Sequence, residues 1–326
     1  MKATAIAPAN IAFIKYWGKR DEKLRIPANT SISMNLSAAF TSTTVEFSKN
    51  LSRHHIELVD EMFSDKEISR IVLHLDRIRD RAGIAQFAKV ITKNTFPKGT
   101  GIASSASGFA ALTVAASAAA GLSLSEKELT ILARLGSGSA CRSIPNGFVE
   151  WTTGEESDDS YACSLYPPEY WDLRDILCIV ETKTKEVSSA TGMEFAQTSP
   201  LWETRQNEIP ERIAQLKQAL REKNFQLFGE IIEEDCLSMY KVMNTQVSPL
   251  FYWTKTTEDC IKEVQANRAS GTLAYFTIDA GPNVHIICEG NSEKKVVDRV
   301  KRILGVQSVL INKPSVGAHL IKEHLF

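Results

Sequence analysis

Residues 97–122 place the strongest constraint on the fold, because a glycine- and serine-rich stretch there runs directly into an apolar segment of small residues. Residues 103–122 are rich in Ala, Ser and Gly, which makes the segment too weakly hydrophobic to cross a lipid bilayer as a helix. We therefore expect a helix buried in the core of a globular protein, with the glycine-rich stretch at its N-terminal end.

The start of this helix is a candidate phosphate-binding site. Gly99 and Gly101 let the backbone approach an anion closely, and the free N–H groups and dipole of a helix N-terminus attract phosphate. The hydroxyls of Ser104, Ser105 and Ser107 would add hydrogen-bond donors. The stretch lacks the Gly-Lys-Ser/Thr ending of a Walker A loop and is not a dinucleotide-binding G-x-G-x-x-G turn. A helix cap that serves packing alone is the alternative.

Composition indicates a protein of two domains that folds unaided. The 326 residues exceed the usual size of one domain, and 43% of them are hydrophobic against 24% charged, an ordinary globular balance. Lysine and arginine number 38 against 39 aspartates and glutamates, so the chain has no overall positive charge for binding nucleic acid or an anionic membrane.

Cysteine usage and the N-terminus predict a cytoplasmic location. The six cysteines are scattered, and they form neither a C-x-x-C pair nor a zinc-ligand spacing with histidine. The N-terminus lacks the apolar core and cleavage site of a signal peptide. We expect reduced thiols and no export.

Hydrophobic periodicity predicts a first half that mixes strands and helices. Apolar residues recur at helical spacing between residues 66 and 82, and Gly83 follows as a stop signal. Other segments alternate or are rich in β-branched residues, which is typical of strands. The predicted strands are 2–14, with a turn at 8–10, then 41–47, 52–59 as the hairpin partner of 41–47, and 87–94.

The second half has the order of a split βαββαβ unit. A polar, acidic loop at 152–161 precedes a strand at 177–182, and helical periodicity over 209–236 is interrupted at Asn224. The remaining predicted elements are a helix at 256–266, strands at 272–279 and 284–288, a helix at 292–304 and a strand at 308–312. This order predicts an α+β protein with domains at 1–180 and 181–326.

Residues 10–20 cluster positive charge directly after an apolar strand. Lys15 and Lys19 are four residues apart, so on one helical turn they would share a face and could bracket an anion. A basic surface turn is the alternative.

Residues 136–143 set Arg142 among small hydroxyl residues. The planar guanidinium of arginine suits a carboxylate or phosphate, and Ser137 and Ser139 leave room for a ligand while adding hydrogen bonds. A structural loop held by an arginine that caps a helix is the alternative reading.

Asp279 ends an apolar strand and precedes a Gly-Pro turn. An aspartate at such a position commonly caps the turn. Beside basic groups, it could instead orient or deprotonate an alcohol that attacks ATP.

The four segments occur together in an order that resembles the diphosphomevalonate decarboxylases of the GHMP kinase superfamily over nearly the whole chain. The matching strings are NIAFIKYWGKRDEKLRIPANTSISMNL, GIASSASGFAAL, GSGSACRSIPNGFVEW and DAGPNVHI. The resemblance implies a two-domain GHMP kinase fold, with a first domain like ribosomal protein S5 domain 2 and a ferredoxin-like second domain. It also implies ATP and Mg²⁺ as cofactors, and a homodimer.

The resemblance also implies a role for each matching residue. Asp279 matches the catalytic aspartate, Lys15 the lysine that keeps it ionised, and Arg142 the arginine that holds the substrate carboxylate. Tyr16, Lys19, Ser137, Ser139 and Ser189 match substrate contacts, and Ser139 is counted with the catalytic group. Gly99, Gly101, Ser104, Ser105 and Ser107 match the ATP phosphate loop.

The implied reaction is decarboxylation of mevalonate 5-diphosphate to isopentenyl diphosphate through phosphorylation of its 3-hydroxyl. This chain departs from many bacterial relatives at Ala190, where they carry an arginine that helps to bind the terminal phosphate, and in the segment 235–240. A mevalonate 5-phosphate decarboxylase and a mevalonate 3-kinase are therefore alternatives within the superfamily. A non-catalytic nucleotide-binding protein is the alternative outside it.

Overall fold

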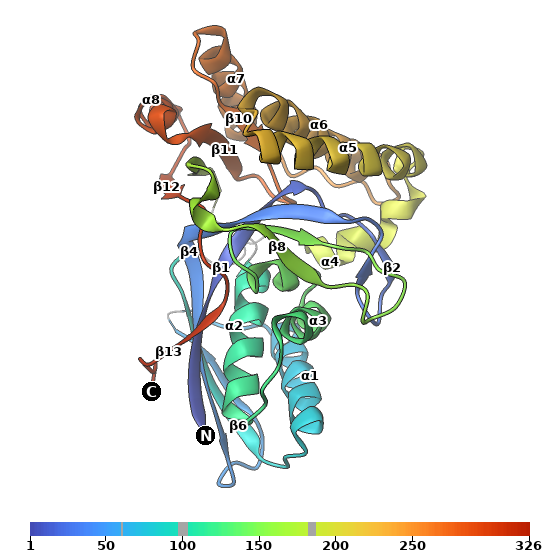
Figure 1. Cartoon of the computed structure of the whole chain (residues 1–326), viewed down its shortest axis with the longest axis vertical. Helices are drawn as coiled ribbons and strands as arrows, with labels where there is room; N and C mark the ends of the chain where they lie inside the picture. The colour runs from blue at the N-terminus through green and yellow to red at the C-terminus, as the bar shows by residue number, and fades with distance from the viewer. Residues whose placement is uncertain (60, 97–103, 182–186) are drawn as a thin grey trace.

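The computed structural model describes residues 1–59, 61–96, 104–181 and 187–326, which form two main sheets with helices on each (Figure 1). The larger sheet contains β1 (Lys2–Ile14), β4 (Ser31–Ser48), β5 (His55–Leu58), β6 (Phe87–Asn94), β7 (Phe148–Trp151), β8 (Ala162–Tyr166) and β13 (His319–Ile321). Its strand order is β13-β1-β4-β6-β5, and β7 pairs with both β4 and β8. A small hairpin of β2 (Lys19–Asp21) and β3 (Ile26–Pro27) follows β1.

Three helices lie on one face of the larger sheet, namely α1 (Asp65–Ala82), α2 (Ser104–Ala119) and α3 (Glu126–Gly136) (Figure 1). Twelve of the 16 residues of α2 are buried, which confirms the core helix predicted from its small side chains. The predicted helix at 66–82 is confirmed as α1, which begins at a capping box formed by Ser64 and Glu67. Among the helices of the described residues, none combines the length and apolar character that a bilayer crossing requires.

Two predictions for the first half are wrong. No turn interrupts β1 at residues 8–10, because an irregularity in register between Pro8 and Asn10 accommodates the proline within the strand. Pro8 also lies beyond the residues of β1 that pair with β13, so its missing N–H costs no ladder bond on that side.

The predicted hairpin between 41–47 and 52–59 does not form either. β6 pairs with residues 41–48 of β4, and β5 pairs in parallel with the other edge of β6. Parallel strands need a long crossover connection, and α1 supplies it between β5 and β6.

The smaller sheet is antiparallel, with β9 (Leu173–Ile179), β10 (Tyr275–Thr277), β11 (Val284–Glu289) and β12 (Ser308–Asn312) in the order β10-β11-β9-β12. Its helices are α5 (Trp202–Glu222), α6 (Phe225–Thr245), α7 (Lys255–Ala269) and α8 (Glu293–Val300). The break predicted at Asn224 is confirmed, since this residue caps α6. The succession of strands and helices confirms the ferredoxin-like βαββαβ unit.

Short helical turns complete the chain: α4 (Ser189–Gly192) and the 3-10 turns η1 (Gly138–Ser143), η2 (Pro168–Tyr170), η3 (Met193–Thr198) and η4 (Gly290–Ser292). The chain does not pass from one sheet to the other at a single point. β9 comes before residue 180 but belongs to the smaller sheet, and β13 comes after residue 180 but belongs to the larger sheet. The division of the chain at residue 180 stays a prediction.

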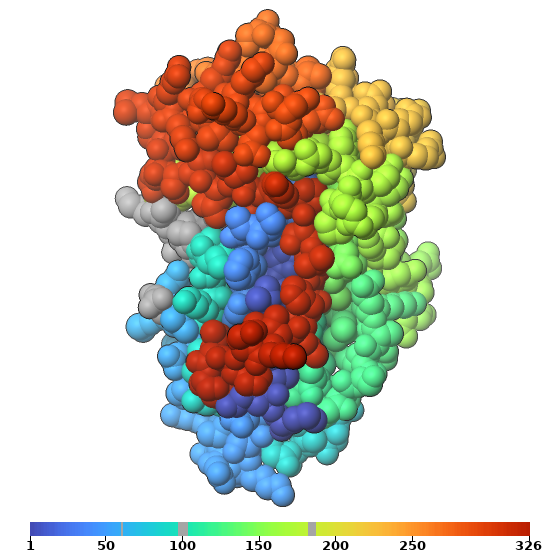
Figure 2. Space-filling model, turned by 60° about the vertical axis from the view of Figure 1, so that its left-hand side comes forward, coloured from blue at the N-terminus to red at the C-terminus, as the bar shows by residue number. Residues whose placement is uncertain are grey.

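One hydrophobic core joins the two sheets. Its buried members include Phe13 of β1 and Phe148 of β7, together with Phe228 of α6 and Leu177 of β9. The rings of Phe13 and Phe228 meet edge to face at 4.8 Å between centroids. The last residues also connect the two parts, because they leave the smaller sheet and run over the N-terminal strands (Figure 2).

Candidate active site

Lys15 and Asp279 form an ion pair where the two sheets meet. Lys15 directly follows β1, and Asp279 follows β10 after one further residue. Lys15 Nζ lies 2.7 Å from Asp279 Oδ1, and only 1% of the lysine side chain is exposed against 24% of the aspartate. Asp279 is therefore the partner that can meet a substrate, while Lys15 supports it from the interior.

The pair keeps Asp279 ionised. Burial alone would raise the pKa of this carboxyl, but the charge and hydrogen bond of Lys15 outweigh it, with help from His285 and Arg142, so the pKa lies below its ordinary value. A carboxylate in this state accepts hydrogen bonds and can receive a proton from an alcohol.

Two buried side chains hold the backbone of Lys15. Asp235 of α6 accepts the Lys15 N–H through Oδ2 at 2.7 Å, and Asn29 donates to the Lys15 carbonyl at 2.9 Å. Arg205 of α5 lies 3.0 Å from Asp235 Oδ1 through Nη1, which neutralises the buried aspartate. The residue that pairs with Asp279 is therefore fixed at both of its backbone polar groups.

The same helix α6 holds the backbone around Asp279. The Tyr240 hydroxyl lies 2.7 Å from the Asp279 carbonyl and 2.9 Å from the Gly281 carbonyl, so it shares one proton between them. The Ile278 N–H donates to Cys236 Sγ at 3.2 Å. One helix thus positions both partners of the ion pair.

Arg142 of η1 is almost fully buried and is held by two strands of the larger sheet. Its Nε donates to Asn10 Oδ1 at 3.1 Å, and its Nη1 donates to Ser31 Oγ at 2.8 Å. Burial lowers the pKa of Arg142, and the charge of Asp279 acts in the opposite direction. Among the described residues, no carboxylate lies within 4.0 Å of this guanidinium and Nη2 has no hydrogen-bond partner. Arg142 therefore has a donor available for an anionic ligand.

Of the serines predicted to contact substrate, Ser137 lies between α3 and η1, and Ser139 lies within η1. Ser137 Oγ is 3.2 Å from Ser105 Oγ at the start of α2. This contact links a residue predicted to bind substrate to a residue of the predicted phosphate loop. Ser139 is half-buried, and its carbonyl accepts from Asn10 at 3.3 Å. Gly138 allows Tyr16 to approach, because a Cβ there would lie 2.8 Å from the Tyr16 hydroxyl oxygen.

Lys19 does not share a helical face with Lys15. Gly18 adopts a left-handed φ of 102° and packs against Trp202, which prevents a helix at this point, and Lys19 opens β2 instead. Its Nζ pairs with Glu22, and the lysine side chain is 3% exposed.

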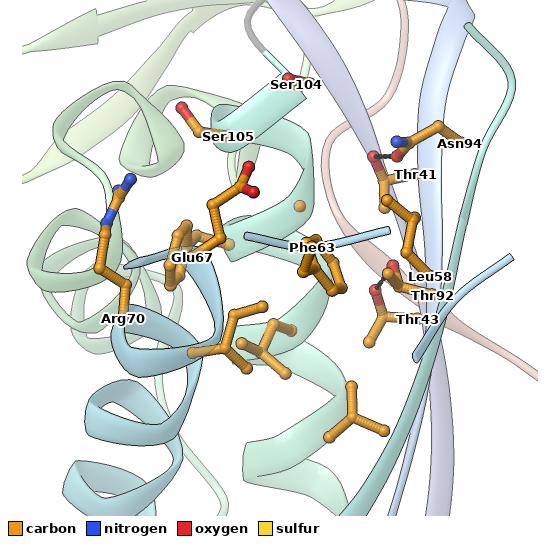
Figure 3. Close-up of a pocket in the computed structure, with 15 residues that line it drawn as sticks. Thr41, Thr43, Leu58, Phe63, Glu67, Arg70, Thr92, Asn94, Ser104 and Ser105 are labelled. Atoms are coloured by element: carbon orange, nitrogen blue, oxygen red, sulfur yellow. Dashed lines mark hydrogen bonds between the residues drawn. The ribbon is translucent and has the colours of Figure 1, made fainter. Parts of the chain in front are cut away.

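The predicted phosphate loop is only partly described. Gly99 and Gly101 lie outside the described residues. Ser104 and Ser105 begin α2 and line a pocket of about 90 Å³ (Figure 3). Ser107 is fully buried, and its Oγ lies 2.7 Å from Thr41 Oγ1. Its hydroxyl is therefore engaged inside the protein and does not line the pocket.

The pocket beside Ser104 and Ser105 has polar and apolar sides. Thr41 is bonded to Asn94, and Thr43 to Thr92, along one wall (Figure 3). Leu58, Phe63, Ile71, Val90, Phe109 and Leu112 supply apolar lining, and Glu67 and Arg70 lie on the α1 side (Figure 3).

Ser189 begins α4, which is attached to the segment that carries Tyr16. Trp17 donates to Gln246 Oε1 at 3.3 Å, and Gln246 donates in turn to the Gly192 carbonyl at 2.9 Å. The predicted substrate contact of Ser189 stays a prediction.

Sequence reasoning missed the residues that position the site. Asn10 orders Arg142 and lies in an apolar strand, where a buried polar side chain is itself a signal of a specific role. Asp235 and Tyr240 both lie in α6, but their partners lie more than 200 and about 40 residues away, respectively, so no local sequence pattern predicts these contacts.

Comparisons with known proteins agree with this arrangement. Residues 7–162 match the diphosphomevalonate decarboxylase-like N-terminal domain, and residues 176–319 match the mevalonate 5-diphosphate decarboxylase C-terminal domain. The diphosphomevalonate decarboxylase of Candida albicans is 34% identical over 93% of this chain and 88% of its own. That of Bos taurus is 33% identical over 91% of this chain and 79% of its own.

Solved structures show the same fold. The mevalonate diphosphate decarboxylase of Staphylococcus aureus superposes with a TM-score of 0.94 at 37% identity, over 98% of both chains. A complex described as MDDEF with MVAPP, AMPPCP and magnesium superposes with a TM-score of 0.93 at 35% identity, over 99% of both chains. The two-domain GHMP kinase fold is confirmed, and the chain belongs to the diphosphomevalonate decarboxylase family.

Proposed function

We propose that this chain is an ATP-dependent carboxy-lyase that converts mevalonate 5-diphosphate to isopentenyl diphosphate in the mevalonate pathway of isoprenoid biosynthesis. The observation that carries the proposal is the ion pair of Lys15 and Asp279, with the available guanidinium of Arg142 acting on the same carboxylate. Membership of the family supplies the substrate class.

Asp279 is the group that starts the reaction. Its carboxylate accepts the proton of the substrate 3-hydroxyl while that oxygen attacks the γ-phosphorus of ATP, and ADP leaves. The charge of Lys15 keeps Asp279 ionised for this step. The new phosphate ester on C3 is a far better leaving group than hydroxide.

Decarboxylation follows from loss of that phosphate. Its departure takes the C3–O electron pair, and the electrons of the bond to the C1 carboxylate then form the new double bond as CO₂ leaves. Arg142 orients the carboxylate, assisted by Ser139, while Asn10 and Ser31 hold the guanidinium in place. Tyr16, Lys19, Ser137 and Ser189 complete the proposed substrate contacts.

ATP would bind at the pocket beside the start of α2, with its phosphates toward the helix N-terminus. Ser104 and Ser105 lie at its rim, where N–H groups and hydroxyls can bind phosphate, with Gly99 and Gly101 proposed to contribute from the preceding loop. The pocket wall formed by Thr41, Thr43, Thr92 and Asn94 offers hydrogen bonds to the nucleoside. The full burial of Ser107 gives it a structural part in this proposal.

Mg²⁺ is compatible with the side chains at this position. No group of three or more His, Cys, Asp or Glu side chains forms a metal site within the described residues. Mg²⁺ needs few such ligands, because it keeps several waters and binds substrate phosphates. Ser104 and Ser105 are oxygen donors that would hold it with the ATP phosphates, and the ion would neutralise phosphate charge.

A substrate panel tests the proposal. The purified enzyme is given ATP and Mg²⁺ with mevalonate, mevalonate 5-phosphate or mevalonate 5-diphosphate, and ADP and CO₂ are both measured. We expect equal amounts of ADP and CO₂, with the highest kcat/KM for the diphosphate. A preference for the monophosphate would establish the first alternative, and ADP without CO₂ would establish a 3-kinase.

Asp279→Ala provides the matched inactive variant. It should still fold, although with a lower free energy of unfolding because Lys15 loses its partner, and it should lose turnover by several orders of magnitude, since the proton acceptor is removed. Near-normal turnover of a folded Asp279→Ala protein would refute the role assigned to this residue and leave a non-catalytic nucleotide binder as the better description.

We further propose a cytoplasmic homodimer. The location is supported by six free cysteines, five of them buried. Burial raises the pKa of the Cys141 thiol to about 12, which keeps it protonated and unreactive. The dimer rests on the resemblance alone, and sedimentation of the purified chain tests it.

A further inference from the structure

The buried ring of Trp151 contacts two side chains that are proposed to bind substrate. Trp151 ends β7, and the strand pairing places it directly opposite Ser31 of β4, whose hydroxyl accepts from Arg142. Arg142 Cζ lies over the Trp151 ring, 5.9 Å from its centroid. The Tyr16 ring meets the same indole edge to face, at 4.7 Å between centroids. Trp151 is therefore a direct neighbour of the arginine proposed to hold the substrate carboxylate.

Buried hydrogen bonds fix the direction of this indole. Trp151 Nε1 donates to Ser160 Oγ at 3.1 Å, and both residues are fully buried. Ser160 Oγ donates in turn to the Thr152 carbonyl at 3.0 Å, and Arg134 of α3 donates to the Ser160 carbonyl through Nη1 at 2.6 Å. The ring cannot move away from Arg142 without leaving buried donors and acceptors unpaired, which is costly.

Arg142 is a buried cation without a paired anion among the described residues. Besides burial, the ionisable groups of Cys141, Asp279 and Tyr16 act on its charge. Burial raises the pKa of the Cys141 thiol to about 12 and also raises the pKa of the Tyr16 hydroxyl, so both groups are neutral near pH 7. Asp279 is ionised, but its carboxylate is paired with Lys15 at 2.7 Å.

An indole face can stabilise such a cation without neutralising it. A carboxylate in its place would form a salt bridge and compete with the substrate carboxylate for the guanidinium. The electron-rich face of tryptophan attracts a guanidinium but carries no net charge, and the attraction is larger where water is excluded. Because Asn10 and Ser31 already engage Nε and Nη1 of Arg142, the ring completes its support and leaves Nη2 for a ligand.

We propose that Trp151 is a positioning residue for the decarboxylation, which holds Arg142 with the face of its ring and leaves the arginine charge available for the C1 carboxylate of the substrate. The inference rests on the proposed function and deepens it, because it names a residue that acts through Arg142. Trp151 is fully buried and need not touch the substrate. Loss of the ring should therefore weaken the interaction with the carboxylate and spare the rest of the substrate.

Calorimetric titration without ATP tests the proposal with two ligands. One is mevalonate 5-diphosphate, and the other is 3-hydroxy-3-methylbutyl diphosphate, which keeps the hydroxyl and the diphosphate but lacks the carboxylate. In Trp151→Leu, the Kd of mevalonate 5-diphosphate should rise by about tenfold, whereas the Kd of the ligand without a carboxylate should change by less than about threefold. Circular dichroism checks that the variant is folded.

Two further variants separate this role from packing. Trp151→Phe keeps an aromatic face against Arg142, so its Kd for mevalonate 5-diphosphate should stay within about threefold of the wild-type value. Trp171→Leu is the matched control, because Trp171 is also buried and donates through Nε1 to a side chain, that of Glu289, but packs in the core against Phe228. It should lower stability and leave both Kd values within about twofold.

Four results would each overturn the assignment. They are equal losses of affinity for both ligands in Trp151→Leu, unchanged affinity of that variant for mevalonate 5-diphosphate, a Trp151→Phe protein that binds as weakly as Trp151→Leu, and the same selective loss in Trp171→Leu.

Turnover distinguishes this inference from the proposed function. If the wild type forms no CO₂ from any of the mevalonates, the proposed function fails. A preference for the ligand with a carboxylate that Trp151→Leu loses and Trp171→Leu keeps would still support the contact of Trp151 with Arg142 as the one that positions the guanidinium. If the wild type is active and Trp151→Leu keeps the full preference, the proposed function stands and the inference is refuted.

Discussion

The acidity of a single carboxyl depends on a lysine that solvent hardly reaches. An unpaired ammonium in the protein interior would be costly, and the ion pair with Asp279 offsets that cost. The pair in turn lowers the pKa of Asp279, against the opposing effect of burial. Lys15 and Asp279 therefore define the pH range in which the proton acceptor is available.

Removal of the Lys15 charge should shift the acidic limb of the pH profile of kcat/KM to higher pH. A lowered pKa means that Asp279 stays ionised as pH falls through the ordinary aspartate value, and protonates only below it. In Lys15→Met the pKa rises, so kcat/KM, normalised to its own maximum, should begin to fall at a higher pH than in the wild type. Lys15→Arg keeps the charge and should retain the wild-type limb. An identical limb in Lys15→Met would contradict the coupling.

Helix α6 acts as a common support for two loops that are far apart in the sequence. Asp235 holds the backbone after β1, and Tyr240, about 1.4 helical turns further along α6, holds the backbone after β10. The Tyr240 ring packs at 4.6 Å from that of Trp253, which fixes the direction of its hydroxyl. A shift of this helix would displace both halves of the ion pair.

Tyr240→Phe isolates the hydroxyl, because the ring can keep its contact with Trp253. The carbonyls of Asp279 and Gly281 then lose a buried donor, which should cost about 1–3 kcal/mol of folding free energy. We expect kcat to fall by about tenfold, with KM for both substrates nearly unchanged. Tyr170→Phe, which loses a bond to the Arg221 carbonyl far from the site, is the control. If kcat is equal in both variants, α6 does not position Asp279 through Tyr240.

At the scale of the whole molecule, the two sheets share a core that neither could bury alone. Phe13 comes from the larger sheet and Phe228 from a helix on the smaller one. A polar link reinforces it, since Asn312 of β12 accepts from the Ala38 N–H of β4 and donates to the buried Asp175. The active site lies along this seam, so its geometry depends on both sheets together.

We therefore expect unfolding in one cooperative transition despite the two-domain architecture. Urea titrations followed by tryptophan fluorescence and by circular dichroism should coincide. Phe228→Ala should lower the free energy of unfolding by about 3–5 kcal/mol and shift both curves together. Leu304→Ala, at a site that is 93% exposed, should change it by less than about 0.5 kcal/mol. Two separate transitions would show that the domains unfold independently.

The sequence by itself determined the local elements. Ser64, Glu67 and Gly83 mark the ends of α1, and Asn224 separates α5 from α6, because caps and stop signals act within a few residues. Strands 87–94 and 308–312 were predicted with the bounds that the structure has. The motif residues, Lys15 and Asp279 among them, were also recognisable one segment at a time.

Only the tertiary structure decided which of these segments meet. Lys15 and Asp279 are 264 positions apart, and Arg25 meets Arg70 and Arg77 only because all three donate to carbonyls at the C-terminal end of α3. The pairing of β5 with β6 rather than β4 likewise depends on which sheet edge the rest of the chain leaves open. Strand pairing and buried charge compensation are interactions between distant residues, so no window of sequence contains both partners, and the packing of the whole chain selects them.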